Sequence, residues 1–117
     1  MAANPRLICA SGDLADGGRG VRFTLQRAGV EEPAFVVRFA GIPRAYLNRC
    51  AHTPIELDWN AGEFFDDSRL YLICAMHGAL YAPETGRCLG GRCRGHGGLI
   101  PLMVEERDGG VYLVEPE

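Results

Sequence analysis

The sequence of 117 residues lacks the features of several large protein classes. It contains no apolar run of about 18 residues, which excludes a membrane-spanning helix, so no membrane partner is expected. The net charge of −3 argues against a nucleic-acid partner, because nucleic-acid-binding domains usually present a basic face. No basic flank followed by a long apolar stretch opens the chain, so we expect no secretory signal and a cytoplasmic location.

Histidine is scarce, with three residues, and the cysteine count of five is odd. A framework of structural disulfides normally uses an even number of cysteines. Disulfides are also rare in a reducing cytoplasm. The cysteines therefore suit metal ligands and thiols better than a set of disulfides.

Sixteen glycines and seven prolines separate short apolar runs, which is typical of an all-β domain. One domain is expected over residues 1–117, because this length suits a single core. Loops are expected at residues 11–20 and 88–98, and the only plausible helical turn lies near residues 54–57. Period-two alternation and β-branched or aromatic residues predict strands at residues 6–10, 21–25, 34–39, 44–47, 63–65, 70–73, 79–82, 99–106 and 111–114.

Two short pairs of cysteine and histidine carry most of the chemical content of the chain. Cys50 and His52 form the first pair, and Cys74 and His77 form the second after an interval of 21 residues. Thiolate and imidazole bind soft and borderline metals, so two neighbouring loops of this kind predict a metal centre. One zinc ion in a Cys₂His₂ tetrahedron and a [2Fe–2S] cluster with two ligands on each iron are the two alternatives.

The order of the ligands favours the cluster. Zinc sites of this composition usually pair two cysteines and then two histidines, whereas each pair here supplies one of each. A two-iron cluster held from both sides needs one ligand of each kind from each loop. A zinc-stabilised interaction module stays the alternative, and visible absorption with metal determination separates the two.

Cys50-Ala51-His52, Cys74-Ala75-Met76-His77-Gly78 and the continuation to Cys88 resemble the Rieske [2Fe–2S] family. The resemblance covers about residues 34–114 and implies one cluster per chain. It also implies that Cys50 and Cys74 hold a buried iron, while His52 and His77 hold an outer, redox-active iron. The fold it implies is a β-sandwich with an inserted rubredoxin-like cluster-binding subdomain, at about residues 48–95.

The resemblance also predicts the redox potential. High-potential relatives have a disulfide between the ligand loops, at positions that match Ile55 and Met76, and a serine hydroxyl at the position of Ala79. Neither device is present here, whereas the tyrosine of those relatives is matched by Tyr81. We therefore expect a potential in the lower part of the Rieske range of about −150 to +300 mV.

Electron transfer is the function that the resemblance implies. We expect a one-electron, ferredoxin-like component of an oxidoreductase or oxygenase system, with a reductase, a terminal oxidoreductase or both as redox partners. The alternative is a small Rieske subunit or redox-sensing module of a larger oxidoreductase, such as a nitrite reductase. A self-contained oxygenase would need two further histidines for its mononuclear iron, and only His96 remains. An electron carrier rather than an enzyme is therefore expected.

The other chemically reactive or aromatic residues are expected to have structural roles. Cys88 and Cys93 are predicted to be thiols in a glycine-rich loop, with a bridge between them or a metal site as the alternatives. Cys9 is predicted to be a small core residue, and His96 an exposed loop residue. Trp59 is predicted to pack beneath a loop. Residues 53–73 hold five acidic side chains against one arginine, a charge that could steer a basic partner or simply be solvated.

Overall fold

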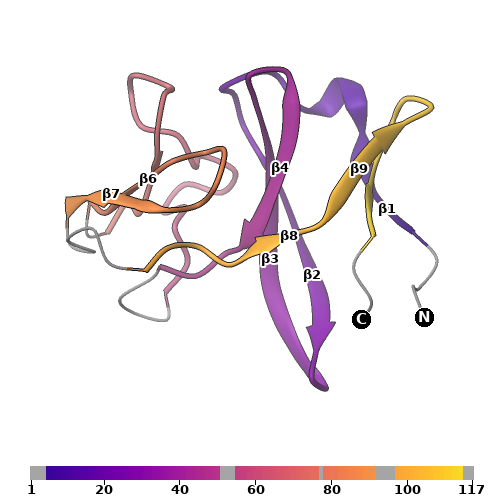
Figure 1. The fold of residues 1–117 in the computed structure, drawn as a ribbon, viewed down its shortest axis with the longest axis horizontal. Helices are drawn as coiled ribbons and strands as arrows, with labels where there is room; N and C mark the ends of the chain where they lie inside the picture. Colours follow the sequence, from indigo (N-terminus) through magenta and orange to yellow (C-terminus); the bar gives the residue numbers. More distant parts are fainter. Residues whose placement is uncertain (1–4, 51–54, 77, 92–96, 115–117) are drawn as a thin grey trace.

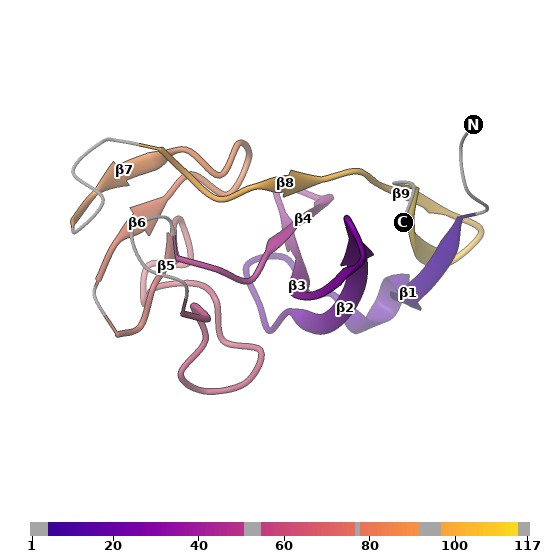
Figure 2. The same cartoon turned by 90° about the horizontal axis from the view of Figure 1, so that it is seen from below.

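Three antiparallel sheets account for the strands of the computed structural model, which describes residues 5–50, 55–76, 78–91 and 97–114. Figures 1 and 2 show β6 and β7 at one end of the molecule and β1 and β9 at the opposite end, with β2, β3 and β4 between them. No helix among the described residues is long and apolar enough to cross a membrane.

The central sheet has the strand order β2-β3-β4-β8. Two-residue turns at Ala28-Gly29 and Ala40-Gly41 join its first three strands, and all four turn residues have positive φ. Such turns match the twist of antiparallel strands, which explains the long and regular hairpins. The strands are β2 (Val21–Arg27), β3 (Val30–Phe39), β4 (Ile42–Leu47) and β8 (Pro101–Leu102).

The other two sheets pack against opposite faces of the central sheet. One has the order β1-β10-β9 and closes through a third positive-φ turn at Asp108-Gly109. Its strands are β1 (Arg6–Ala10), β9 (Val104–Arg107) and β10 (Gly110–Leu113). The small sheet has the order β5-β6-β7, with β5 (Leu72–Ile73), β6 (Leu80–Tyr81) and β7 (Cys88–Gly90).

β3 is buried on both faces and therefore separates two cores. Ala34 and Val36 belong to the core shared with β1 and β10, whereas Phe35 and Val37 belong to the core shared with β5 and β6. Successive side chains of a strand point to opposite faces, so four consecutive buried residues supply both cores. The run Ala34–Val37 lacks polar alternation for this reason.

Two aromatic contacts attach the small sheet and its neighbouring hairpin to the central sheet. Phe64 stacks on Phe35 with ring centroids 3.9 Å apart and an interplanar angle of 12°. The hydroxyl of Tyr46 on β4 donates a 2.6 Å hydrogen bond to the carbonyl of Pro83, in the turn between β6 and β7. Burial raises the pKa of Tyr46 to about 12, which keeps its hydroxyl a donor over the physiological pH range.

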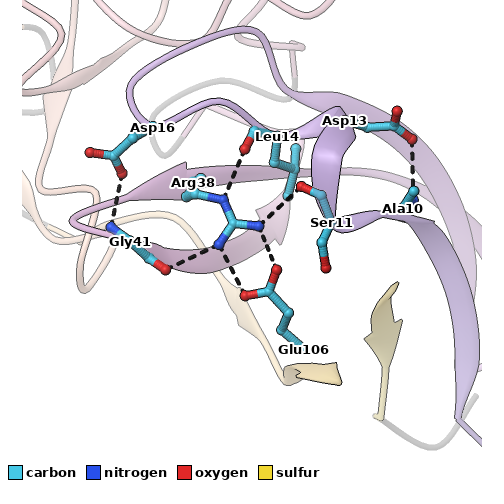
Figure 3. A network of polar contacts seen from close by, with 8 residues as sticks. All are labelled: Ala10, Ser11, Asp13, Leu14, Asp16, Arg38, Gly41 and Glu106. Atoms are coloured by element: carbon cyan, nitrogen blue, oxygen red, sulfur yellow. Dashed lines mark hydrogen bonds and ion pairs between the residues drawn. The ribbon is translucent and has the colours of Figure 1, made fainter. Parts of the chain in front are cut away.

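At the end of the molecule formed by β1 and β9, Arg38 connects several loops by hydrogen bonds (Figure 3). Its guanidinium donates five hydrogen bonds, two of them to the carboxylate of Glu106 on β9 at 2.6 and 3.0 Å. The other three reach the backbone carbonyls of Ser11, Leu14 and Gly41. One side chain on β3 thus joins the short 3-10 turn η1 (Ser11–Asp13), the β3–β4 turn and β9.

Most predicted strands are present, with four differences. The strand predicted at 99–106 is divided into β8 and β9, which belong to different sheets. Residues 63–65 form only one bridge, Phe65 with Leu72, although the expected hairpin is closed by backbone hydrogen bonds. Cys88–Gly90 is strand β7 rather than loop, because it pairs with β6. A helical turn lies at Ser11–Asp13 and not among the described residues of the 54–57 segment. The all-β fold class is confirmed.

We predict that Glu106→Gln lowers the melting temperature at pH 7 and flattens its dependence on pH below 4.5. Hydrogen bonds from Arg38 lower the pKa of Glu106 from 4.5 to about 2, so the carboxylate stabilises the fold above pH 4.5. That contribution disappears as the pH falls towards 2. Thermal unfolding across this range is the measurement. The control is Glu105→Gln. Glu105 forms an exposed ion pair with Arg107, so little change in melting temperature is expected. Equal melting temperatures of Glu106→Gln and wild type at pH 7 contradict the prediction.

Candidate metal centre

Cys50 and Cys74 lie in the same core, at the end of the molecule formed by the small sheet. Cys50 follows β4 and is 2% exposed, and Cys74 follows β5 directly and is 0% exposed. Both are thiols. The two other expected ligands, His52 and His77, lie outside the described residues, and so does most of the loop between Cys50 and Ile55.

Backbone hydrogen bonds hold the two cysteine loops beside each other. The N–H of Cys50 donates to the carbonyl of Ile55 at 2.8 Å, which closes the described ends of the first loop. The N–H of Ala75 donates to the carbonyl of Leu57 at 2.9 Å and so joins the second loop to the chain that leaves the first. The N–H of Cys74 donates to the carbonyl of Ala79, also at 2.9 Å. The described segments next to the two thiols are therefore bonded to each other through Ala75 and Leu57.

Glycine is required where a third loop approaches the second. Gly78 has φ +72°, and its N–H donates to the carbonyl of Cys74 at 2.7 Å. A Cβ on Gly91 would lie 2.5 Å from the carbonyl oxygen of Gly78, closer than any real contact. Gly91, directly after β7, therefore packs against the second cysteine loop.

Tyr81 connects the small sheet to the first cysteine. Its side chain is fully buried, and its hydroxyl oxygen lies 3.4 Å from the sulfur of Cys50. On the neighbouring strand, Leu72 pairs with Tyr81, two residues before Cys74. The hydroxyl becomes the donor whenever the sulfur is a thiolate. The position of Tyr81 is thus both that of a core residue and that of a donor directed at sulfur.

A buried polar pair behind the first cysteine loop was not found from the sequence. The side-chain amide of Asn48 donates to Asp58 at 2.9 Å and accepts from the N–H of Leu57 at 2.8 Å. Asp58 also accepts from the N–H of Gly62 at 2.9 Å, and Arg22 lies 3.3 Å from its carboxylate. The pair fixes the strand end before Cys50 to the segment 57–62 across the loop. Asp58 is therefore buried and does not belong to the acidic surface expected for residues 53–73.

The described donor set suits a thiolate-bound metal centre. Buried thiolates are costly unless a metal or a hydrogen bond compensates their charge, and both cysteines lie among apolar side chains. Thiolates also select zinc, copper(I) and iron–sulfur clusters over hard cations. Among the residues that the structure describes, no three histidine, cysteine, aspartate or glutamate side chains converge, so Cys50 and Cys74 supply only part of the expected site.

Several single-residue predictions are now tested. Cys9 is a core residue as expected, 8% exposed. The prediction for Trp59 is wrong, because the indole is 71% exposed rather than packed beneath a loop. The prediction of a thiol at Cys88 is also wrong, because Cys88 is disulfide-bonded. Cys93 and His96 lie outside the described residues.

Three residues near the cysteines occupy the positions that raise the redox potential in high-potential relatives. Ile55 packs against the core, Met76 is 55% exposed, and Ala79 is fully buried. None of these three side chains can bridge the loops or donate a hydroxyl hydrogen. The structure therefore agrees with the absence of two devices that raise the potential in the relatives described above.

The Rieske [2Fe-2S] domain family matches residues 4–104 of the chain. The ferredoxin of carbazole 1,9a-dioxygenase from Nocardioides aromaticivorans IC177 superposes with a TM-score of 0.72 at 18% identity, over 97% of this chain and 100% of that chain. A chain from the complex of reduced oxygenase and oxidized ferredoxin in carbazole 1,9a-dioxygenase gives 0.69 at 24% identity, over 95% and 94%.

The terminal oxygenase of carbazole 1,9a-dioxygenase from Nocardioides aromaticivorans IC177 has a TM-score of 0.74 at 18% identity, over 97% of this chain but only 30% of that chain. No protein with a curated description matches. At these identities the solved structures show a shared fold, and the family match carries the assignment of the domain.

We predict that Asn48→Ala lowers the free energy of unfolding by about 1–3 kcal/mol, because a buried acceptor on Asp58 and the N–H of Leu57 lose their partner. Urea unfolding measures this difference. Asn60→Ala is the matched control, since Asn60 is exposed, and its effect should stay within about 0.5 kcal/mol. Equal losses in both variants contradict a role for the Asn48–Asp58 pair.

Proposed function

Because the chain belongs to the Rieske [2Fe-2S] domain family, we propose that it is a one-electron carrier of the ferredoxin type. The observation that carries the proposal is the pair of buried thiols, Cys50 and Cys74, on adjoining loops within one core. A Rieske-type [2Fe–2S] cluster, which the family implies, supplies the one-electron chemistry. The coverage of two ferredoxin-sized chains almost end to end supports a carrier rather than a catalyst.

We assign the ligands residue by residue. Cys50 and Cys74 hold the inner iron as thiolates, and His52 and His77 hold the outer iron through one imidazole nitrogen each. Residues 48–95 form the cluster-binding part of a single domain that spans residues 1–117. The support is the small sheet β5-β6-β7, whose strands all lie within residues 48–95, and the core that it shares with both cysteines.

Two side chains near the cysteines bear on the potential of the proposed centre. The hydroxyl of Tyr81 approaches the sulfur of Cys50 and stabilises negative charge on it. Ala79, buried beside Cys74, offers no hydroxyl in addition. A potential in the lower part of the Rieske range follows from this combination.

The proposed partners are a reductase that supplies the electron and a terminal oxygenase that accepts it. The complex of oxygenase and ferredoxin in carbazole 1,9a-dioxygenase, one of whose chains shares this fold, supports that pairing. The location that we propose is a reducing cytoplasm, which suits the thiols of Cys9, Cys50 and Cys74 among the described cysteines, whereas the disulfide of Cys88 is unusual for that compartment.

We predict that Cys50→Ala and Cys74→Ala each abolish the visible absorption and the electron paramagnetic resonance signal of the reduced protein. Loss of either thiolate would leave the inner iron with one of its two protein ligands. Cys9→Ala is the matched control, because Cys9 is a buried thiol in the other core and should leave both signals intact. A colourless wild-type protein with one bound zinc, or a cluster that survives either ligand substitution, would contradict the proposed function.

We predict that Tyr81→Phe lowers the midpoint potential by about 20–60 mV. The hydroxyl stabilises the more negative, reduced state by a net hydrogen-bond energy of about 0.5–1.5 kcal/mol, and about 1.4 kcal/mol corresponds to 59 mV for one electron. Protein-film voltammetry gives the potential. Tyr112→Phe on β10 is the control and should leave it unchanged. An unaltered potential in Tyr81→Phe would rule out the hydroxyl–sulfur interaction as a determinant.

A further inference from the structure

An exposed groove lies beside the second cysteine loop. Its cavity measures about 390 Å³ and is lined by Trp59, Asn60, Glu63, Phe65, Ile73, Ala75 and Met76. Trp59 is 71% and Met76 55% exposed, although large apolar side chains normally avoid water. Tryptophan and methionine are enriched in protein interfaces, where they supply contact area that adapts to a partner.

The groove is continuous with the proposed metal centre. Ala75 and Met76 directly follow Cys74, and the N–H of Ala75 donates to the carbonyl of Leu57, two residues before Trp59. The segment 55–71 lies at the same end of the molecule as β6 and β7, away from β1 and β9 (Figures 1 and 2). A partner that binds Trp59 and Met76 would therefore contact the chain two positions after Cys74, whose thiol is buried.

Acidic side chains border the groove. Glu63 lines it and also lines a neighbouring hollow with Asp66 and Asp67. Arg19 pairs with Glu63 at 3.3 Å, and the guanidinium of Arg69 donates to the backbone carbonyl of Gly17. Three carboxylates and two arginines thus lie on the side of the groove next to this hollow, which leaves that border with an excess of one negative charge. An apolar centre with a charged rim is the usual anatomy of a transient interface.

We infer that the groove of Trp59 and Met76 is the docking site for a redox partner whose electron-transfer surface carries an apolar projection ringed by lysine or arginine. This inference rests on the proposed function, and it names the surface through which the electron is exchanged. The indole and the thioether contact the projection, and the acidic rim steers the basic ring during the encounter.

Reduction of cytochrome c, a basic redox protein, by the dithionite-reduced wild-type protein tests the inference under pseudo-first-order conditions at low ionic strength. Trp59→Ala should lower the second-order rate constant by about fivefold or more, the effect of losing an interface residue worth about 1 kcal/mol. Leu7→Ala is the matched control, because Leu7 on β1 is 58% exposed at the other end of the molecule. Its rate constant should stay within about twofold of wild type.

A second pair of variants tests the rim. Asp67→Lys should slow the reaction at low salt and approach the wild-type rate at high salt, because screening removes the steering. Glu31→Lys, an equivalent charge change at the β2–β3 hairpin, should have a smaller effect. The potential and resonance spectrum of each variant must equal those of wild type.

The outcomes separate the inference from the proposed function. If the spectra are intact and Trp59→Ala reacts as fast as Leu7→Ala, docking at the groove is wrong while the carrier function stands. The same holds if Asp67→Lys and Glu31→Lys slow the reaction equally. If the wild-type protein shows no Rieske spectrum, the proposed function fails first and the inference falls with it.

Discussion

Burial of both faces of β3 is the constraint on which the rest of the structure depends. Ala34 and Val36 complete the core towards β1 and β10, and Phe35 and Val37 complete the core that contains Cys50 and Cys74. A shift of β3 by one residue would exchange these two sets, so that the smaller Ala34 would replace Phe35 and the packing of both cores would be lost. The register of the hairpins β2–β3 and β3–β4, set by their two-residue turns, therefore also sets the position of the metal centre.

At each end of the molecule, one polar side chain holds the loops, but the two side chains differ in chemistry. At one end, Arg38 on β3 donates hydrogen bonds to three backbone carbonyls and to the carboxylate of Glu106. At the other end, Asn48 follows β4 and ties the chain before Cys50 to Asp58 and Leu57. Both side chains compensate loop backbone that has no strand partner, which is where buried polar groups otherwise cost most. The loops at each end can therefore be irregular in sequence and still keep a defined shape.

The sequence was sufficient for features that leave a local pattern. The alternation within residues 21–25 and the β-branched run at 34–39 predicted strands, and the mixed spacing of Cys50, His52, Cys74 and His77 predicted the family that the domain match confirms. The ligand assignment of these four residues stays a prediction. Strand β7 was missed because it is only three residues long and opens a segment rich in glycine and arginine, and it forms through pairing with β6.

Non-local contacts leave no such pattern, and this explains the remaining errors. Asn48 and Asp58 are ten residues apart, and nothing in their spacing marks them as partners across a loop. The exposure of Trp59 was also missed, because an indole between polar residues reads equally well as packing or as surface. Asp58 was counted with the acidic surface for the same reason. Burial of a single polar side chain becomes visible only with the fold.

The apolar core around Cys50 and Cys74 and the hydroxyl of Tyr81 have opposite effects on the electron affinity of the proposed centre. Gaining an electron adds negative charge, and the apolar core around the thiols disfavours that charge by excluding water. The hydroxyl of Tyr81 near the sulfur of Cys50 favours it, but Ala79 contributes a methyl group where a hydroxyl would help. Burial acts on both cysteines, whereas the tyrosine acts on one sulfur. Burial therefore opposes, and the hydroxyl of Tyr81 supports, electron uptake at the proposed centre.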